Sequence, residues 1–444
     1  MKKYDEYKDS GVAWIGEVPK HWEVIKTSLA FQGIGSGTTP STSKKEYYDD
    51  NGNGKYWLQT GDLEDGIVYD TSKKVSTIAI KECNLTFYPI DSIIIAMYGA
   101  TIGKVGILGI ESATNQACCV IPVTKKQIAK YFFYEFLACK PALLIAAIGG
   151  GQPNISQDTI KKLKIVIPPI NEQTAIATYL DTHCAKIDNL ISIQQKRIAL
   201  LQELKQSVIT HAVTKGLNPN VEMKQSGVEW IGDVPKHWEV CKLKHYSQVV
   251  LGKMLMTSPP KDSEGLYTLE KYLKSKNIGW LQLFLDEDNI DEMWFNQYEK
   301  SIYKLQENDI VMNEGGDIGK VSCWRGVDFD CYIQNSINKI TADYNRVNAG
   351  FLCYWLYNLS SLGYFWSIVS QISIAHLTKE KLSNSPVVLP PITEQAAIAS
   401  YLDHKCATID TSISNAQHQI DLLQEYKQSL ITEVVTGKRK VTDN

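Results

Sequence analysis

Mostly apolar residues recur at alternating steps of four and three in two long stretches of the chain. The first series runs through positions 180, 184, 187, 191, 194, 198, 201, 205, 208 and 212, and the second through 402, 406, 409, 413, 416, 420, 423, 427, 430 and 434. This heptad pattern predicts two long helices, over 171–216 and 393–444, that pair as a coiled coil. The alternative is two separate surface helices, each on its own domain. Pro-Pro precedes each stretch, and Asn171 and Thr393 are expected as N-caps.

The segments before the two helices have a different pattern. Residues 25–166 and 241–388 hold short β-branched and aromatic runs, broken by Gly, Asn, Asp and Ser. Such runs predict strands. The stretches 128–146 and 348–370 are predicted to be helical. Together with the long helices, this predicts an α+β protein.

The chain also repeats itself. KDSGVAWIGEVPKHWEV at 8–24 returns as KQSGVEWIGDVPKHWEV at 224–240, with 14 of 17 positions identical, and IPPINEQTAIATYLD at 167–181 returns as LPPITEQAAIASYLD at 389–403. The chain is therefore a tandem duplication. The middle parts of the two copies match only at isolated points. Near-identical helices indicate one partner bound twice, whereas divergent domains on a shared scaffold indicate two different ligands.

Composition narrows the class of protein. With 444 residues, 44% hydrophobic and 21% charged, the chain is long enough for two or three soluble domains. It has no apolar run of the roughly 18 residues that span a bilayer, and its polar start does not resemble a secretion signal. The ten cysteines form no Cys-x-x-Cys pair, which favours a reducing, cytoplasmic location. A net charge of −3 argues against a free-standing nucleic-acid binder, but not against one that works beside basic partners.

One stretch imitates a phosphate-binding loop. YGATIGKVG at 98–106 has Gly-Lys behind an apolar run, but only three residues separate Gly99 from Gly103, and Val105 stands where a magnesium-binding hydroxyl is needed. The following VGILGI predicts a strand rather than a helix. The second copy, GGDIGKVS at 315–322, has the same defects. We therefore predict strand–turn–strand and no nucleotide hydrolysis.

Other candidate active sites are equally weak. FQGIGSG at 31–37 resembles a methyltransferase glycine loop but runs into Thr-Thr-Pro-Ser, and no Pro-Pro pair lies in an amino-methylation motif. No convincing nuclease carboxylate cluster or ligand-spaced histidine pair is found. His21 and His237, in matching Lys-His-Trp sequences, are expected to pack or cap rather than catalyse. The residues thus predict no catalytic group, no metal and no cofactor in this chain.

Several motifs together carry a family resemblance. The W-x-G-x-V-P-x-H-W lead, the IAMYGATIGKVGIL turn, NQACC, GQPNIS and P-P-x-x-E-Q resemble the specificity subunit of type I restriction–modification systems over essentially the whole chain. The second copy departs from this pattern, with GGDIGKVS for the turn and QISIAHL for GQPNISQ.

The resemblance implies an architecture and a set of partners. Two α/β target-recognition domains, within residues 1–170 and 217–392, would each read half of a split double-stranded DNA site. The helices at 171–216 and 393–444 would form an antiparallel coiled coil that separates the domains and docks two modification (methyltransferase) subunits. Restriction subunits, which are ATP-dependent motors with a nuclease, would join through that assembly. The specificity subunit itself would catalyse nothing and need no cofactor, and no membrane is involved.

Candidate DNA contacts follow from this resemblance. Lysines beside glycines suit phosphate contact, and loop residues with donors and acceptors suit base edges. The alternative for Gln152 and Asn154 is that they cap a turn that leads into residues 157–163. Trp14, Trp22, Trp230 and Trp238 are expected to be core anchors rather than base-stacking residues. The predicted contacts are Thr38, Thr39, Thr101, Lys104, Gln152, Asn154, Ser156, Lys253, Lys320, Gln371, Ser373 and His376.

Two other function classes stay open on the residues alone. One is a coiled-coil scaffold whose divergent domains bind two proteins without touching DNA. The other is a self-sufficient enzyme with an unrecognised site. DNA binding in the presence of the modification subunits separates the first from the leading hypothesis, and activity of the chain alone would support the second.

Overall fold

The computed structural model describes residues 2–49, 53–147, 154–261, 263, 265–286, 289–369 and 375–441. The chain divides into two units, and each takes segments from distant parts of the sequence. Unit 1 comprises Met1–Gln195 and Gln417–Asn444, and unit 2 comprises Lys196–Ala416. Both boundaries fall within the two long helices, α5 (Ile170–Lys215) and α10 (Ile392–Val435). Each unit thus holds the first half of one long helix and the second half of the other.

Unit 1 is built around a five-stranded sheet of order β4-β11-β8-β9-β6, with a three-stranded sheet of order β10-β5-β7 beside it. The described strands of unit 1 are β1 Tyr7–Asp9, β2 Glu17–Pro19, β3 Glu23–Lys26, β4 Gly35–Ser36, β5 Lys55–Leu58, β6 Gly66–Val68, β7 Lys73–Val75, β8 Ile93–Ala96, β9 Val105–Leu108, β10 Ala113–Thr114, β11 Cys118–Ile121 and β12 Lys164–Ile167. Its other helices are α1 Thr27–Ala30, α2 Thr77–Glu82, α3 Ala129–Ile145 and α4 Gln157–Lys162, with short 3-10 turns at Lys45–Tyr47 and Thr60–Asp62.

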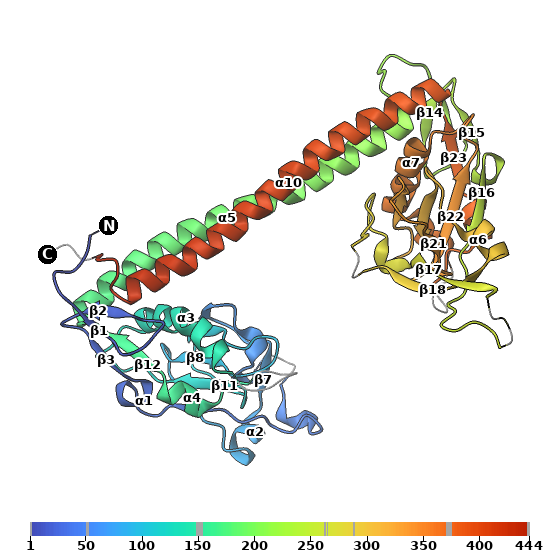
Figure 1. Cartoon of the computed structure of the whole chain (residues 1–444). Coiled ribbons are helices and arrows are strands. Elements are labelled where there is room, and N and C mark those ends of the chain that lie inside the picture. Colours follow the sequence, from blue (N-terminus) through green and yellow to red (C-terminus); the bar gives the residue numbers. More distant parts are fainter. Residues whose placement is uncertain are drawn as a thin grey trace. The chain divides into compact units, whose positions relative to one another are not determined.

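The two faces of the five-stranded sheet are buried in different cores. Ile93 and Ile95 of β8 point into the core that contains α3 and the long helices. Ile94 and Ala96, which alternate with them, point into a second core. This period of two is what a strand imposes, and burial on both faces explains the unbroken apolar run in the sequence. Figure 1 shows α3 lying along this sheet.

Unit 2 has a related plan with a four-stranded sheet of order β16-β22-β19-β20 and a three-stranded sheet of order β18-β17-β21. Its described strands are β13 Met223–Gln225, β14 Asp233–Pro235, β15 Glu239–Lys242, β16 Ser247–Leu251, β17 Tyr267–Leu273, β18 Asp291–Asn296, β19 Ile310–Asn313, β20 Val321–Cys323, β21 Tyr332–Ile333, β22 Ile337–Ala342 and β23 Pro386–Leu389. Its other helices are α6 Gln297–Tyr303, α7 Ala349–Ser361, α8 Tyr364–Ile368 and α9 Lys379–Ser383, with 3-10 turns at Leu243–His245 and Ser275–Asn277. The predicted α+β class is confirmed.

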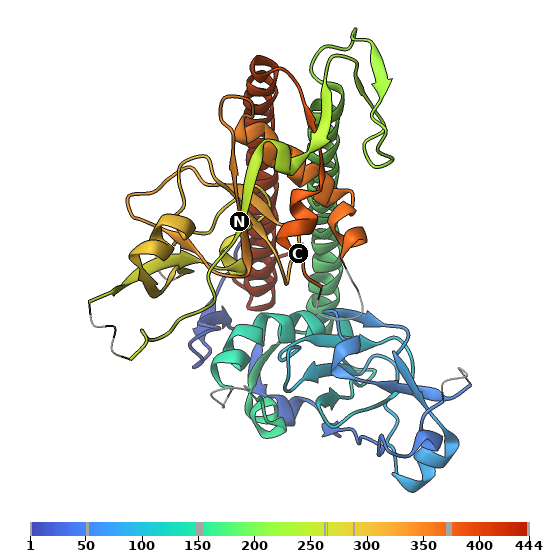
Figure 2. The ribbon, with the colours of Figure 1, turned by 90° about the vertical axis from the view of Figure 1, so that its right-hand side faces the viewer.

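The long helices run antiparallel within each unit, as both ribbon views show (Figure 1, Figure 2). All twenty predicted heptad positions are buried or half-buried. In unit 1, Lys427 of α10 donates to Asp188 of α5 at 2.6 Å. In unit 2, Lys205 of α5 donates to Asp410 of α10 at 2.7 Å. The two ion pairs are the same contact in both copies, because 188 and 410, like 205 and 427, are 222 positions apart. The predicted coiled coil is confirmed, and the alternative of separate surface helices is excluded.

The repeated Glu-Gln pair after Pro-Pro joins three parts of each unit. In unit 1, Glu172 accepts from Tyr4 at 2.8 Å and from Trp22 at 3.1 Å, and pairs with His21 at 2.7 Å. Gln173 accepts the Ile128 N–H at the start of α3 and donates to Pro168 O. This motif therefore fixes the N-terminal lead and the domain helix to the first turn of the long helix.

Unit 2 repeats the histidine and glutamine contacts but not that of Trp22, because Trp238 Nε1 has no hydrogen-bond partner in the described part of the chain. Glu394 pairs with His237 at 2.8 Å, and Gln395 accepts the Asn348 N–H and donates to Pro390 O. His21 and His237 thus occupy equivalent positions, each paired with the glutamate in the first turn of a long helix. Trp22 and Trp238 are fully buried, as expected, and Trp14 is half-buried. The prediction is wrong for Trp230, which is 43% exposed and meets Tyr364 edge-on.

Two local predictions are also wrong. Asn171 and Thr393 are not N-caps, because α5 begins at Ile170 and the Gln173 N–H already bonds to Pro169 O at 2.9 Å. The helices therefore start two residues earlier than Asn171 and Thr393 as N-caps would imply, directly after the Pro-Pro pair. The single helix expected over 348–370 is split into α7 and α8, because Gly363 adopts a left-handed φ of +80°.

Candidate functional site

The glycine turn of unit 1 joins β8 to β9 without a helix, as predicted. Gly99 and Gly103 have φ of +82° and +74°, which favours glycine. The Lys104 N–H bonds to Thr101 O at 2.9 Å and the Gly103 N–H to Ala96 O at 2.9 Å. Strand β9, rather than the N-terminus of a helix, follows this turn, so the phosphate-loop interpretation is excluded. Lys104 and Thr101 are both partly exposed.

Other loops lie at the same end of the five-stranded sheet. Thr38 and Thr39 follow β4, are exposed, and are held by the Thr38 N–H bond to Thr114 O at 3.0 Å. A Cβ placed on Gly37 would lie 1.7 Å from Thr114 O, so only glycine allows this approach. The segment is extended rather than helical, which excludes the methyltransferase loop. On the other side of the turn, Asn154 bridges to Tyr98 and is exposed. The structure therefore brings these predicted residues to one end of one sheet.

Unit 2 places a similar set of loops at the matching end of its sheet. Gly316 and Gly319 have φ of +70° and +86° in the turn between β19 and β20. His376 packs beside this turn, with Nδ1 2.8 Å from Glu314 Oε2. The two turns differ in charge, because Lys320 pairs with Asp317, whereas no acidic side chain in the described part of unit 1 pairs with Lys104. The prediction that these residues contact DNA stays a prediction.

The prediction that Lys253 contacts a DNA phosphate is wrong, because its side chain is only 6% exposed. Its Nζ donates to Trp294 O at 2.7 Å and to Glu299 Oε2 at 2.5 Å, and it lies 5.0 Å from the centre of the Phe295 ring. A cation held by a carboxylate and an aromatic face stabilises the loop rather than binding an exposed ligand. Glu299 is 46 positions away in the sequence, so the local pattern could not reveal it.

Ser156, another predicted contact, has a structural role in the fold. Ser156 is the N-cap of α4, with its Oγ accepting the Thr159 N–H at 3.0 Å. Ser156 therefore caps α4, whereas the capping role considered for Asn154 does not describe that residue, which forms the isolated bridge to Tyr98. Gln152, Gln371 and Ser373 lie outside the described residues.

Sequence reasoning missed one polar side chain at this end of the sheet. Gln116 is exposed, and the Thr39 hydroxyl donates to its amide oxygen. It lies in the Asn-Gln turn before β11, and a Gln-Asn turn, Gln334–Asn335, occupies the matching place before β22. The sequence did carry a signal for these turns: a pair of amide residues, which stands as Asn115-Gln116 in unit 1 and in the opposite order, Gln334-Asn335, in unit 2. Side chains with both donors and acceptors suit reading of base edges.

The two cysteines at the start of β11, near the glycine turn, are not suited to covalent chemistry. Burial raises the pKa of the Cys119 thiol to about 12 and also raises the pKa of Cys118, so neither forms a thiolate near neutral pH. Burial likewise raises the pKa of Tyr98 in the turn itself. Among the described residues, no group of His, Cys, Asp and Glu could hold a metal ion. Nor is any helix in that part of the chain long and apolar enough to cross a membrane.

Comparisons with known proteins agree on one family. The family described as "Type I restriction modification DNA specificity domain" matches residues 19–202 and again residues 235–420. A relative from Methanocaldococcus jannaschii, the type I restriction enzyme MjaVIII specificity subunit, is 26% identical over 96% of this chain and 94% of its own length. The EcoBI specificity subunit of Escherichia coli is 24% identical over 73% of this chain and 69% of its own.

Solved structures share the fold. A chain from a study of complex assembly and conformational transition of the type I R-M system aligns with a TM-score of 0.70 at 14% identity, covering 94% of this chain and 98% of its own. The HsdS subunit from Thermoanaerobacter tengcongensis aligns with a TM-score of 0.51 at 14% identity, covering 95% of this chain and 98% of its own. At this identity the similarity concerns the fold only.

Proposed function

Since the chain belongs to the family of type I restriction–modification specificity subunits, we propose that unit 1 and unit 2 each read one half of a bipartite, asymmetric double-stranded DNA site. The subunit is non-catalytic, because the relatives are specificity subunits and the activities of type I systems lie in other subunits. DNA methylation and ATP-dependent restriction are thus carried by its partners.

One observation carries the proposal. Both units present a glycine turn with a lysine and a second loop with amides at the same end of a related sheet, yet the side chains differ between the units. Unit 1 offers Thr39, Lys104 and Gln116, and unit 2 offers Asn335 and His376. Lysine contacts to phosphate position a protein on DNA, and polar side chains in the groove select bases. Related scaffolds that carry different side chains support two different half-sites.

We further propose that the complex contains two modification subunits for each copy of this chain. Exposed apolar side chains recur on the long helices at positions 222 residues apart, outside the buried seam. Such side chains outside a core indicate an interaction surface. In unit 1 they are Ile170, Leu422 and Tyr426, and in unit 2 Ile392, Leu200 and Leu204. The same partner can therefore meet the same surface in each unit.

The remaining partners follow from the family. Restriction subunits join through the modification subunits, and this chain carries no cofactor, since ATP and the methyl donor serve the catalytic subunits. The proposed location is the cytoplasm, where the DNA and these partners are found.

Two experiments test the function. DNA binding of the chain with its modification subunits is measured on the methylated motif and on unrelated DNA, and the motif itself comes from methylome sequencing with and without this gene. We expect a split motif and preferential binding to it. A complex that assembles but does not bind DNA would favour the alternative of a protein-binding scaffold. Catalytic activity of the chain alone would favour the alternative of a self-sufficient enzyme.

Native mass spectrometry tests the docking surface. We expect two modification subunits on the unaltered chain and one on the double variants L200E/L204E or L422E/Y426E, each of which alters one unit. Two subunits retained on both double variants would place the docking surface elsewhere.

A further inference from the structure

Asp65 occupies an unusual backbone position beside the glycine turn of unit 1. It lies directly before β6, which pairs in parallel with β9, and its φ is +54°. A residue with a Cβ adopts this left-handed conformation at a cost of roughly 1 kcal/mol. Such local strain is retained where the surrounding contacts require it, and it clusters at functional sites.

Both carboxylate oxygens of Asp65 have partners. Oδ1 accepts the Val105 N–H at 2.8 Å, and Oδ2 receives Lys140 Nζ of α3 at 3.1 Å. The side chains of Asp65 and Lys140 are only 33% and 28% exposed, so the ion pair is partly shielded from water. Asp65 thus joins the first residue of β9 to the helix that covers the sheet.

These contacts hold the residues on both sides of Lys104. Val105, which follows it, is fixed by Asp65. Gly103, which precedes it, lies against the stem of Lys140, since a Cβ on Gly103 would be 3.4 Å from Lys140 Cγ. Lys104 itself is left partly exposed, with no ionic partner among the residues that the structure describes. The arrangement fixes the backbone of the turn and leaves its ammonium available.

Unit 2 keeps the backbone position but not the carboxylate. Leu281 has a φ of +57°, and its N–H bonds to Val321 O at 2.9 Å. Val321 follows Lys320 as Val105 follows Lys104. A left-handed residue beside the valine after the lysine therefore recurs, but Leu281 has no carboxylate to accept the Val321 N–H as Asp65 accepts that of Val105. Among the described residues, Lys104 has no acidic partner, while Asp317 pairs with Lys320 in unit 2.

We propose that Asp65 is a positioning residue that, with Lys140, holds the Lys104 turn in the conformation that contacts a DNA phosphate. This inference rests on the proposed DNA-reading function and assigns Asp65 no contact with DNA. The positioning role and simple electrostatics predict opposite effects of removing the Asp65 carboxylate on DNA binding. If the negative charge acted only at a distance, its removal would strengthen DNA binding. If Asp65 positions the Lys104 turn, its removal weakens DNA binding.

The test is a double-mutant cycle on the complex with modification subunits, read as affinity for cognate DNA over a range of salt. K104A should weaken binding about eightfold near 0.1 M salt, from a slope of roughly 0.9 per phosphate. D65A should weaken binding by up to the same factor and flatten the salt dependence. The double variant D65A/K104A should bind no more weakly than K104A, because Asp65 acts through Lys104.

Two further variants separate positioning from folding and charge. D65N keeps an oxygen for the Val105 N–H and tolerates the left-handed conformation, so it should bind more tightly than D65A. D158A removes an exposed carboxylate that pairs with Lys162 in the same unit and should not weaken binding. Thermal melting of each variant verifies that unit 1 is folded.

The possible outcomes are distinct. D65A binding that equals or exceeds that of the unaltered protein, or D65A and K104A effects that multiply, would overturn the positioning role. If K104A bound DNA as tightly as the unaltered protein, Lys104 would not contact a phosphate and Asp65 would have no positioning role. Specific binding by the unaltered complex would still support the proposed function in that case. A folded complex without any DNA binding would overturn that function itself.

Discussion

At the scale of single residues, the two copies connect the domain helix to the neighbouring strand through different side chains. Glu135 of α3 is fully buried in unit 1, and its Oε1 accepts the Val166 N–H at 2.8 Å. At the matching place in α7, Trp355 donates to Pro386 O at 2.9 Å. Both side chains tie the domain helix to the strand before the long helix. Only the carboxyl group makes this tie dependent on pH.

Burial raises the pKa of Glu135 to about 8 from its ordinary 4.5. The folded protein therefore keeps a proton that the unfolded chain releases, so stability falls as pH rises between these two values. Across that interval the loss is on the order of 5 kcal/mol. We predict that E135Q flattens this dependence, with the variant melting below the unaltered protein near pH 5 and above it near pH 9. Equal pH slopes for both proteins in thermal melts would show that Glu135 is not the titrating group.

A matched pair of glycines tests packing at the end of α10. Gly437 and Gly227 have the same φ of +75°, so alanine strains the backbone equally at both. A Cβ on Gly437 would lie 2.3 Å from Pro19 Cδ, whereas a Cβ on Gly227 meets nothing within 4 Å. We predict that G437A lowers the melting temperature of unit 1 clearly more than G227A lowers that of unit 2, by an added cost of roughly 1–3 kcal/mol. Equal shifts would mean that Pro19 and Trp22 move aside freely.

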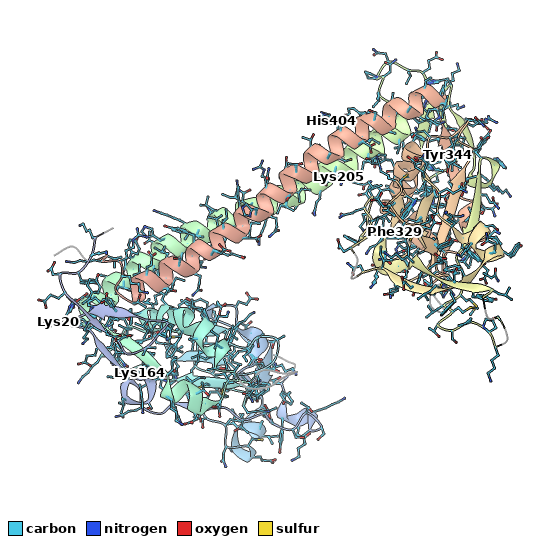
Figure 3. All side chains as sticks on the ribbon, viewed as in Figure 1. Lys20, Lys164, Lys205, Phe329, Tyr344 and His404 are labelled. Atoms are coloured by element: carbon cyan, nitrogen blue, oxygen red, sulfur yellow. The ribbon has the colours of Figure 1, made fainter. Side chains whose placement is uncertain are left out.

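At the scale of elements, the heptad seam fixes which residues of the two long helices meet. A charged residue in the seam specifies register, because only one alignment supplies its partner. Lys205 (Figure 3) and Lys427 fill this role once in each unit, with Asp410 and Asp188 as partners. The aspartates are about half exposed, so each pair contributes roughly 0.2–1 kcal/mol, and its value lies mainly in specificity.

A charge swap tests the register. We predict that D188K, which places two lysines together, lowers the thermal stability of unit 1, and that D188K/K427D recovers most of the loss. The measurement is a double-mutant cycle of melting temperatures, with the equivalent swap at Asp410 and Lys205 as the matched test in unit 2. A double variant no better than the sum of its single changes would exclude a direct pairing.

The same elements show what sequence can predict here. Heptads, β-branched runs and the duplication are local or periodic signals, and they predicted the coiled coil, the domain class and the strand–turn–strand around Lys104. Contacts across long sequence separations left no such signal. The burial of Lys253 depends on Glu299, and the brace on Lys104 depends on Asp65 and Lys140. The positions of the loops were therefore predictable from the sequence, whereas the burial and the bonding partners of each loop side chain were not.

At the scale of the whole molecule, each unit borrows part of its core from the other copy of the repeat. The end of α10 completes unit 1, where Tyr7 Oη donates to Gly437 O and Tyr131 Oη to Val435 O. The end of α5 completes unit 2, where Thr210 donates to Asn358 at 2.6 Å. The two near-identical helices thus support both domains in the same manner. The divergent loops can then change without changing the scaffold, which is what two independent half-sites require.

This independence yields the last prediction. Q116A alters a loop of unit 1, and H376A alters a loop of unit 2, so each should relax base preference in a different half of the split motif. Loss of a side chain that reads a base costs roughly 1–3 kcal/mol of discrimination at that position. Methylome sequencing of cells that express each variant with the modification subunits measures both halves at once. K104A is the control, since loss of a phosphate contact lowers methylation at all sites without changing the motif. If Q116A and H376A relaxed the same half, the two units would not read the site separately, and the assignment of one half-site to each unit would be wrong.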